Sequence, residues 1–165
     1  MQRFKRNGKQ KILLFPTDGS PIPQEKIPDE AFSTGILGTG FAVFPESGTV
    51  YSPLSGQVES VADARHAYTL IGDDGVELLV HVGIDTVELK GEGFLSMVSE
   101  GDRVRAGEVL ARVDLSLLKE KGLHPHVVVM ITNPDGIQEL QLCTERGLGG
   151  KSEAAVYRTA TNKKE

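Results

Sequence analysis

Two histidines flank a strong turn signal in the middle of the chain, and their spacing predicts that they meet. His66 precedes one apolar run and His81 lies in the next, with Gly72-Asp73-Asp74-Gly75 between the two runs. This pattern is typical of a β-hairpin. If the turn is symmetric about its two aspartates, His66 lies directly opposite His81, with Cβ atoms about 4.5–5.5 Å apart on one face. A one-residue bulge would place the two side chains on opposite faces.

A pair of adjacent imidazoles is more typical of a functional site than of a core, because each ring brings a donor and an acceptor that need partners. In a surface depression, one ring can act as nucleophile while the other donates a hydrogen bond to the transferred group. An imidazole nitrogen attacks phosphorus readily and also leaves readily, so the pair suits phosphoryl transfer. Asp85 follows on the face of His81 by the strand period of two, and it could orient a ring or help to bind a cation.

The same residue types also allow a metal site. Two histidines and one carboxylate form a familiar zinc set, so zinc held by His66 and His81 stays open at this point. His124-Pro125-His126 adds a second pair of closely spaced histidines. The proline between them disfavours ladder pairing, so a loop is expected there.

The elements that would position these histidines are mostly strands. Short apolar runs lie between turn signals such as Pro-x-x-Gly. They predict strands at residues 40–44, 49–51, 68–71, 76–82, 109–113 and 127–132. The best helix candidate is Leu115 to Lys121, which Gly122 ends. The expected fold class is therefore all-β: an antiparallel β-sandwich or flattened barrel with a few short helical turns.

Composition limits the function further. The 165 residues suit one folded domain, expected at 12–157, between a basic flexible tail at 1–11 and a polar flexible tail at 158–165. The formal charge of -5 argues against nucleic acid as a general partner. No apolar run approaches the ~20 residues of a membrane span, so no stable membrane insertion is expected. The single cysteine, Cys143, excludes an internal disulfide and indicates a reducing, cytoplasmic compartment. The protein is expected to be a monomer.

No nucleotide-binding loop is present in the sequence, so a phosphoryl group would have to arrive from another protein. The run from Gly75 to Val87 closely resembles the phosphohistidine signature of the glucose-type IIA components of the bacterial phosphoenolpyruvate-dependent sugar phosphotransferase system. The match continues through Phe94. It covers most of the chain, from about Phe15 to Tyr157, and includes residues 29–33, 37–43, 101–107 and 128–133.

The resemblance implies a cytoplasmic phosphotransferase component that works as a phosphohistidine carrier in sugar transport. His81 would accept a phosphoryl group from phospho-HPr and pass it to a cysteine of a IIB domain of a sugar permease. His66 would support the transfer, and the surrounding apolar rim would dock the partners. No cofactor is required, although in some relatives zinc bridges the histidine pair to a partner's carboxylate. Many relatives have threonine two residues before the supporting histidine, where this chain has Ala64, and that hydroxyl can orient the ring.

The main alternative is a lysostaphin-type zinc peptidase, whose His-x-x-x-Asp and His-x-His ligands would correspond to His81, Asp85, His124 and His126. The residues after His81 continue the carrier signature instead, which disfavours the peptidase. A biotinyl-type carrier is a second alternative, suggested by residues 52–56 and 101–107. It would need a Met-Lys-Met hairpin, which the sequence lacks.

Overall fold

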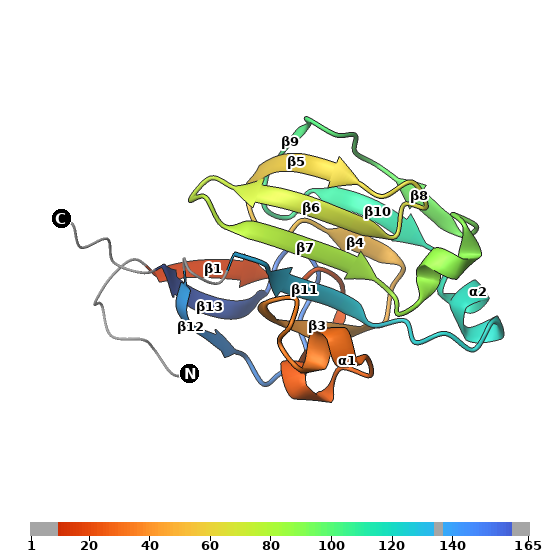
Figure 1. The fold of residues 1–165 in the computed structure, drawn as a ribbon, viewed down its shortest axis with the longest axis horizontal. Coiled ribbons are helices and arrows are strands. Elements are labelled where there is room, and N and C mark those ends of the chain that lie inside the picture. Colours follow the sequence, from red (N-terminus) through yellow and green to blue (C-terminus); the bar gives the residue numbers. More distant parts are fainter. Residues whose placement is uncertain (1–9, 134–136, 160–165) are drawn as a thin grey trace.

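The computed structural model describes residues 10–133 and 137–159, and its architecture is a set of packed antiparallel sheets (Figure 1). The strands are β1 (Gln10–Leu14), β2 (Gly19–Pro23), β3 (Thr39–Pro45), β4 (Thr49–Tyr51), β5 (Gly56–Val61), β6 (Ala67–Gly72), β7 (Glu77–Val82), β8 (Phe94–Ser96), β9 (Arg103–Val104), β10 (Val109–Val113), β11 (Val127–Ile131), β12 (Ile137–Leu142) and β13 (Glu153–Thr159). Short helices are α1 (Glu30–Ser33) and α2 (Leu115–Glu120), with 3₁₀ turns η1 (Gln24–Lys26) and η2 (Thr86–Leu89).

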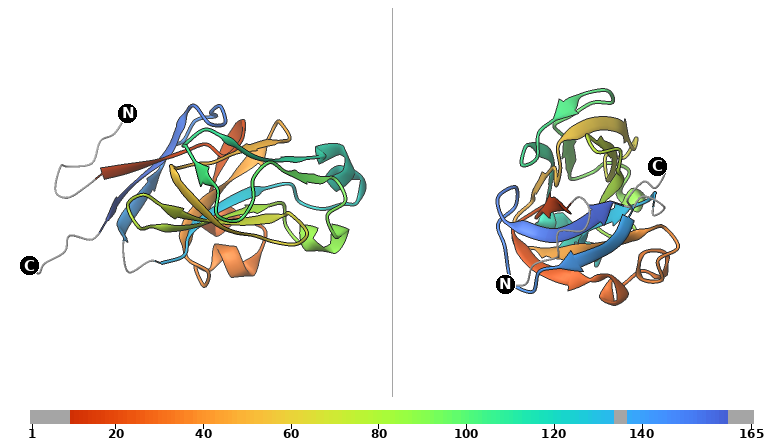
Figure 2. Two further views of the ribbon diagram at one scale, coloured as in Figure 1. Left: turned by 90° about the horizontal axis from the view of Figure 1, so that it is seen from above. Right: turned by 90° about the vertical axis from the view of Figure 1, so that its left-hand side faces the viewer.

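Seven strands form the largest sheet, in the order β2-β3-β11-β7-β6-β5-β9. Two three-stranded sheets, β4-β10-β8 and β1-β13-β12, complete the fold, and the paired strands run antiparallel. In Figure 2, α1 lies on one side of the large sheet and the smaller sheets lie on the other. The sheets do not close into a barrel, so the predicted all-β sandwich is confirmed in its open form.

Both faces of the large sheet are covered near its centre. One face packs on the smaller sheets through the main core, which includes Val80, Val82 and Val129. The other face carries a second cluster in which α1 supplies Phe32 and β11 supplies Val128 and Met130. All five residues of β11 are buried, as expected for a strand with both faces covered. His81 lies between Val80 and Val82, so its side chain points to the α1 face.

The strands predicted from apolar runs are present as β3, β4, β6, β7, β10 and β11, and the predicted helix is α2. Asp114 caps α2 by accepting a hydrogen bond from the Leu117 amide. Helix α1 was not predicted, because its four residues are too few to show a helical period. Its N-cap is Asp29, whose side chain accepts from the amides of Ala31 and Phe32.

Two residues of each predicted tail lie in strands of the structure. Gln10 and Lys11 belong to β1, where they pair with Arg158 and Tyr157 of β13. Pairing between the ends of the domain gives these polar residues backbone partners that no local pattern shows. The rest of both predicted tails lies outside the described residues. Within the described part of the chain, no helix is long and apolar enough to cross a membrane.

Candidate functional site

The hairpin of β6 and β7 has a different register from the one predicted. Ala67, and not His66, lies opposite His81, and Ile71 lies opposite Glu77. The reason is an asymmetric turn, in which the Gly72 amide donates to the Val76 carbonyl and Gly75 adopts φ 90°. A three-residue loop that ends in a left-handed glycine is a common hairpin connection. The symmetric turn was therefore the wrong choice, by one residue.

The two imidazoles nevertheless meet, with ring centroids 5.1 Å apart and planes at 85°. His66 lies just before β6, and its carbonyl accepts a hydrogen bond from the Val82 amide at 2.7 Å. The preceding residue, Arg65, has φ 60°, a left-handed backbone that costs a non-glycine residue about 1–2 kcal/mol. His66 precedes the first residue of β6, so its side chain does not follow the alternation of that strand. The predicted ring contact is thus present, although the register used to predict it is not.

The orientation of the His81 ring is fixed by the backbone that follows it. Its Nδ1 lies 2.7 Å from the Gly83 carbonyl oxygen, which can only accept, so Nδ1 carries the proton and donates. The Nε2 atom of the neutral ring then keeps its lone pair. A carbonyl group two residues from the histidine therefore orients the ring, and the orienting role of Asp85 stays a prediction.

The turn that presents this carbonyl is itself tightly held. Gly83 has φ 79°, and a Cβ there would collide with Thr86 and lie 3.2 Å from Leu118. Thr86 is fully buried, and its hydroxyl donates to the Val82 carbonyl at 2.6 Å. Glycine is required here both for the backbone conformation and for the space.

Burial and nearby negative charges shift the pKa of His81 in opposite directions. Phe32 of α1 packs against its ring at 5.2 Å between centroids. Desolvation lowers the pKa of His81, and the neighbouring His66 lowers it further. The Gly83 hydrogen bond and the charges of Asp29 and Asp85 raise that pKa, but burial has the largest effect. Burial therefore favours the neutral ring, the form in which an imidazole can act as a nucleophile.

His66 is held less completely than His81. Desolvation lowers its pKa as well. Its Nδ1 is buried, and the protein provides no hydrogen-bond partner for it. Ala64, two residues before, has no hydroxyl to offer. The departure noted in the sequence thus coincides with an unsatisfied nitrogen in the structure.

Three features near the histidines were not predicted from sequence: Asp29, Phe32 and the Gly83 carbonyl. Asp85 itself is exposed, has φ 61°, and makes no capping bond to η2 through its side chain. Asp29 and Asp85 bring negative charge near His81 from two different loops. Asp29 followed by a short apolar segment was a capping signal that could have located α1.

The second histidine pair, His124 and His126, lies beside the loop that follows His81. Its carbonyls accept from the amides after His81: His126 from Gly83 at 2.8 Å, and His124 from Ile84 at 2.9 Å. The rings of His124 and His126 are 5.6 Å apart, and His126 also packs against Phe44 at 5.1 Å. His126 is only 8% exposed, and its Nδ1 is buried with no protein partner.

The ligand set of a zinc peptidase is not assembled. Among the described residues, no group of three or more histidine, cysteine, aspartate or glutamate side chains could hold a metal ion. His81 and His66 form one ring pair and His124 and His126 form another, and the Asp85 side chain is exposed.

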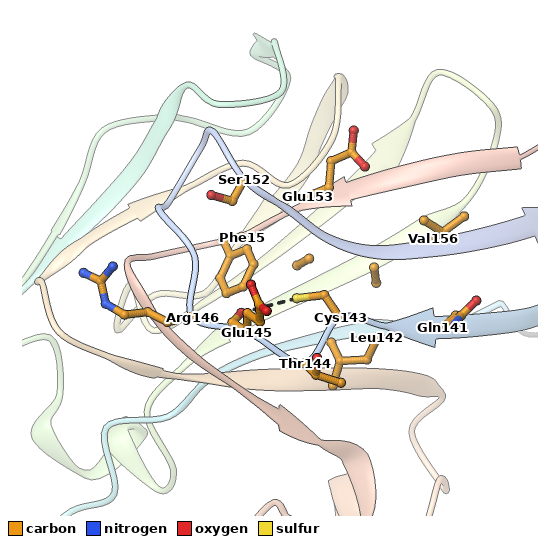
Figure 3. Close-up of a pocket in the computed structure, with 12 residues that line it drawn as sticks. Phe15, Gln141, Leu142, Cys143, Thr144, Glu145, Arg146, Ser152, Glu153 and Val156 are labelled. Atoms are coloured by element: carbon orange, nitrogen blue, oxygen red, sulfur yellow. Dashed lines mark hydrogen bonds between the residues drawn. The ribbon is translucent and has the colours of Figure 1, made fainter. Parts of the chain in front are cut away.

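A separate hollow of about 660 Å³ lies at the three-stranded sheet β1-β13-β12, between β12, β13 and the segment that joins them (Figure 3). Phe15, Leu142 and Cys143 line it, together with Glu145 and Arg146. Cys143 is half-buried, and its thiol lies 3.5 Å from the Glu145 carbonyl. None of the four histidines lines this hollow, so it is separate from the candidate site.

Comparison with known proteins agrees with this geometry. Residues 11–137 match the family model described as phosphoenolpyruvate-dependent sugar phosphotransferase system, EIIA 1. A glucose-specific EIIA component of Halalkalibacterium halodurans is 37% identical over 145 residues, which are 87% of this chain and 84% of that protein. One from Staphylococcus aureus is 38% identical over 136 residues, 82% of each chain.

Two further relatives extend the comparison. A glucose-specific EIICBA component of Streptococcus pneumoniae is 38% identical over 84% of this chain, which spans only 19% of that longer protein. The solved structure of glucose permease IIA from Mycoplasma capricolum has a TM-score of 0.82 at 31% identity, covering 93% of this chain and 99% of that one. The chain belongs to the EIIA 1 family of the phosphoenolpyruvate-dependent sugar phosphotransferase system, and it is a phosphoryl carrier in sugar uptake.

Proposed function

We propose that Nε2 of His81 is the atom that carries the phosphoryl group. The observation that carries this proposal is the 2.7 Å hydrogen bond from Nδ1 to the Gly83 carbonyl, which leaves Nε2 unprotonated. The Nε2 lone pair forms a bond to phosphorus as the bond between phosphorus and the donor protein breaks. The Gly83 carbonyl also stabilises the positive charge that the imidazole gains in this step.

His66 supports the second half of the reaction. Its ring lies against that of His81 at 5.1 Å, so a proton on its outer nitrogen can be donated to a phosphoryl oxygen. That hydrogen bond offsets charge on the phosphoryl group as it leaves. The buried Nδ1, with no protein partner, leaves the tautomer of His66 less strictly fixed than that of His81.

The donor is HPr and the acceptor is a cysteine of a IIB domain. Large hydrophobic side chains are exposed on elements that adjoin the histidines: Ile36 and Leu37 after α1, Phe44 on β3, and Val87 on η2. Exposed apolar groups of this kind suit protein docking. The streptococcal relative supports a IIB partner, because its printed name, EIICBA, places A, B and C units in one chain.

Of the two histidines that could bind zinc at a partner interface, His81 is held as a ligand should be and His66 is not. His81 meets the usual requirement that a ligating histidine donates its other nitrogen to an oxygen acceptor, whereas His66 does not. His66 and His81 would supply two nitrogen ligands, and a partner carboxylate would supply the third. A bound zinc would link the two proteins, and it would prevent Nε2 of His81 from attacking phosphorus.

Labelling tests the central assignment. The protein is incubated with radioactive phosphoenolpyruvate, enzyme I and HPr, and the site of the label is mapped. We expect one acid-labile phosphate per chain, on His81, and its transfer to an added IIB domain. Label that persists in His81→Ala would disprove the assignment.

A further inference from the structure

We propose that Arg65 is a positioning residue that sets the phosphoryl-delivery step by holding the His66 ring against His81. This rests on the proposed support of His81 by His66. In the hairpin register, the residue opposite His66 is Val82, which belongs to the main core on the face away from His81. A His66 that continued the strand regularly would therefore point into that core.

The chain turns at Arg65, directly before His66. Val61, the last residue of β5, pairs with Tyr68, and the Ala62 amide donates to the Ala67 carbonyl at 2.9 Å. Between these residues the chain forms a turn in which the Arg65 amide donates to the Ala62 carbonyl. The left-handed φ of 60° at Arg65 then redirects the chain immediately before His66. The ring of His66 contacts the ring of His81 on the α1 face, so the turn at Arg65 fixes the backbone from which this ring extends.

A left-handed residue other than glycine, asparagine or aspartate persists only where its surroundings hold it. Three hydrogen bonds do so. The Tyr68 hydroxyl, on a fully buried side chain, donates to the Arg65 carbonyl at 3.2 Å. The guanidinium of Arg65 donates through Nε to the Phe94 carbonyl at 3.2 Å and through Nη2 to the Gly91 carbonyl at 3.4 Å. Both the backbone and the side chain of this residue are therefore anchored.

The anchor connects the two histidine loops. Gly91 and Phe94 follow η2, and η2 follows His81 and the Gly83 turn directly (Figure 1). Gly91 has φ 92°, and a Cβ at this position would lie 2.6 Å from Nη2 of Arg65. The loop therefore leaves room for the guanidinium to approach closely. Through Arg65, the segment that carries His66 is fixed to the segment that follows His81.

The test compares three variants of the full chain: Arg65→Ala, Arg65→Gly, and the control Arg103→Ala. The control removes the same charge from an exposed ion pair between Arg103 of β9 and Asp73. Because misplacing a catalytic group by about 1 Å can cost up to 10²-fold, we expect both Arg65 variants to deliver phosphate to IIB about tenfold more slowly. Acceptance from phospho-HPr should stay within about twofold of wild type, since the Gly83 contact of His81 is unchanged. Normal delivery by both Arg65 variants would overturn the proposal.

Two measurements separate positioning from a general structural effect. Cross-ring proton contacts between His66 and His81, observed by NMR, should be lost in Arg65→Ala and kept in Arg103→Ala. In a His66→Gln background, Arg65→Ala should cause no further loss of delivery, because it acts through His66. An additional tenfold loss there would refute the proposal. If Arg65→Ala fails to fold, Arg65→Lys, which keeps the charge but cannot bridge both carbonyls, takes its place in each measurement.

The same data distinguish failure of the two proposals. Normal delivery by His66→Gln would remove the supporting role of His66, whatever Arg65 does. Loss of the cross-ring contacts in the Arg65 variants would still show that Arg65 positions the ring. Intact contacts in those variants, with His66→Gln impaired, would reject Arg65 alone.

Discussion

The molecule contains two pairs of adjacent imidazoles at similar separations, 5.1 Å for His66 and His81 and 5.6 Å for His124 and His126. His81 stays half-buried and gives its Nδ1 proton to the Gly83 carbonyl at 2.7 Å. His126 is almost fully buried beside Phe44, and its Nδ1 has no protein partner. Proximity of two rings is therefore common to both pairs, whereas a tautomer fixed by a hydrogen bond, on a ring that is only half-buried, is found for His81. That difference is what a phosphoryl carrier needs.

The largest expected effect is a contrast between the pairs. His81→Ala should abolish phosphate labelling, because it removes the proposed nucleophile. His126→Ala should keep labelling at His81, although truncating a ring that packs against Phe44 costs stability. Labelling kinetics and thermal unfolding of both variants provide the check. Loss of labelling in a folded His126→Ala protein would mean that the second pair takes part in the chemistry.

The next effect concerns delivery. His66→Gln should accept phosphate at close to the wild-type rate but transfer it to IIB roughly 10²-fold more slowly, the usual size of a lost general-acid contribution. His124→Gln is the matched control, since it changes the exposed member of the second pair. Single-turnover transfer from purified phosphoprotein measures the step. Equal delivery by the two variants would contradict a special role for His66.

A smaller effect is expected from the carbonyl that orients His81. Gly83→Ala places a methyl group against Thr86 in a left-handed backbone, at a cost of about 1–3 kcal/mol. The variant should unfold at lower temperature and accept phosphate about tenfold more slowly, as the Gly83 oxygen moves away from Nδ1. Gly75→Ala controls for the backbone cost alone, because its added Cβ contacts nothing within 4 Å. Equal labelling rates in the two variants would count against the Gly83 contact.

Both pairs should also affect stability at acid pH. Burial lowers the pKa of His66, His81 and His126 from 6.5. In each case the unfolded chain binds the proton more readily than the folded chain. Stability is therefore complete above about pH 6.5 and falls as pH decreases below it. Urea unfolding at several pH values should show a weaker decline in His126→Phe than in wild type; an unchanged decline would show that His126 does not contribute.

The smallest expected effect is an increase in the rate of phosphoryl delivery. Ala64→Thr supplies a hydroxyl two residues before His66, whose buried Nδ1 has no protein partner. If the hydroxyl reaches that nitrogen, it fixes the tautomer, and delivery to IIB should rise by about two- to fivefold, the worth of one modest hydrogen bond. Ala64→Val is the control of equal shape without the hydroxyl. Identical delivery by the two variants would show that the tautomer of His66 is not limiting.

Residue types and spacing alone determined much of this protein. Alternating apolar runs between turn signals predicted the strands that carry the site, because a half-buried strand imposes a period of two. Gly72-Asp73-Asp74-Gly75 identified the hairpin, and the run around His81 identified the family. The sequence also indicated that His66 and His81 belong together, which the 5.1 Å ring contact bears out.

Tertiary structure decided how His66 and His81 meet. The turn added one residue to the loop, so that Ala67 faces His81, yet the rings of His66 and His81 meet directly after a left-handed residue, Arg65. Both choices differ by small energies that local sequence does not reveal, and the Arg65 conformation depends on carbonyls from Gly91 and Phe94, more than twenty residues away. The orientation of His81 likewise depends on the position of a carbonyl group, which every residue possesses. A chemical signature can be read from side chains, but backbone acceptors acquire a role only through the fold.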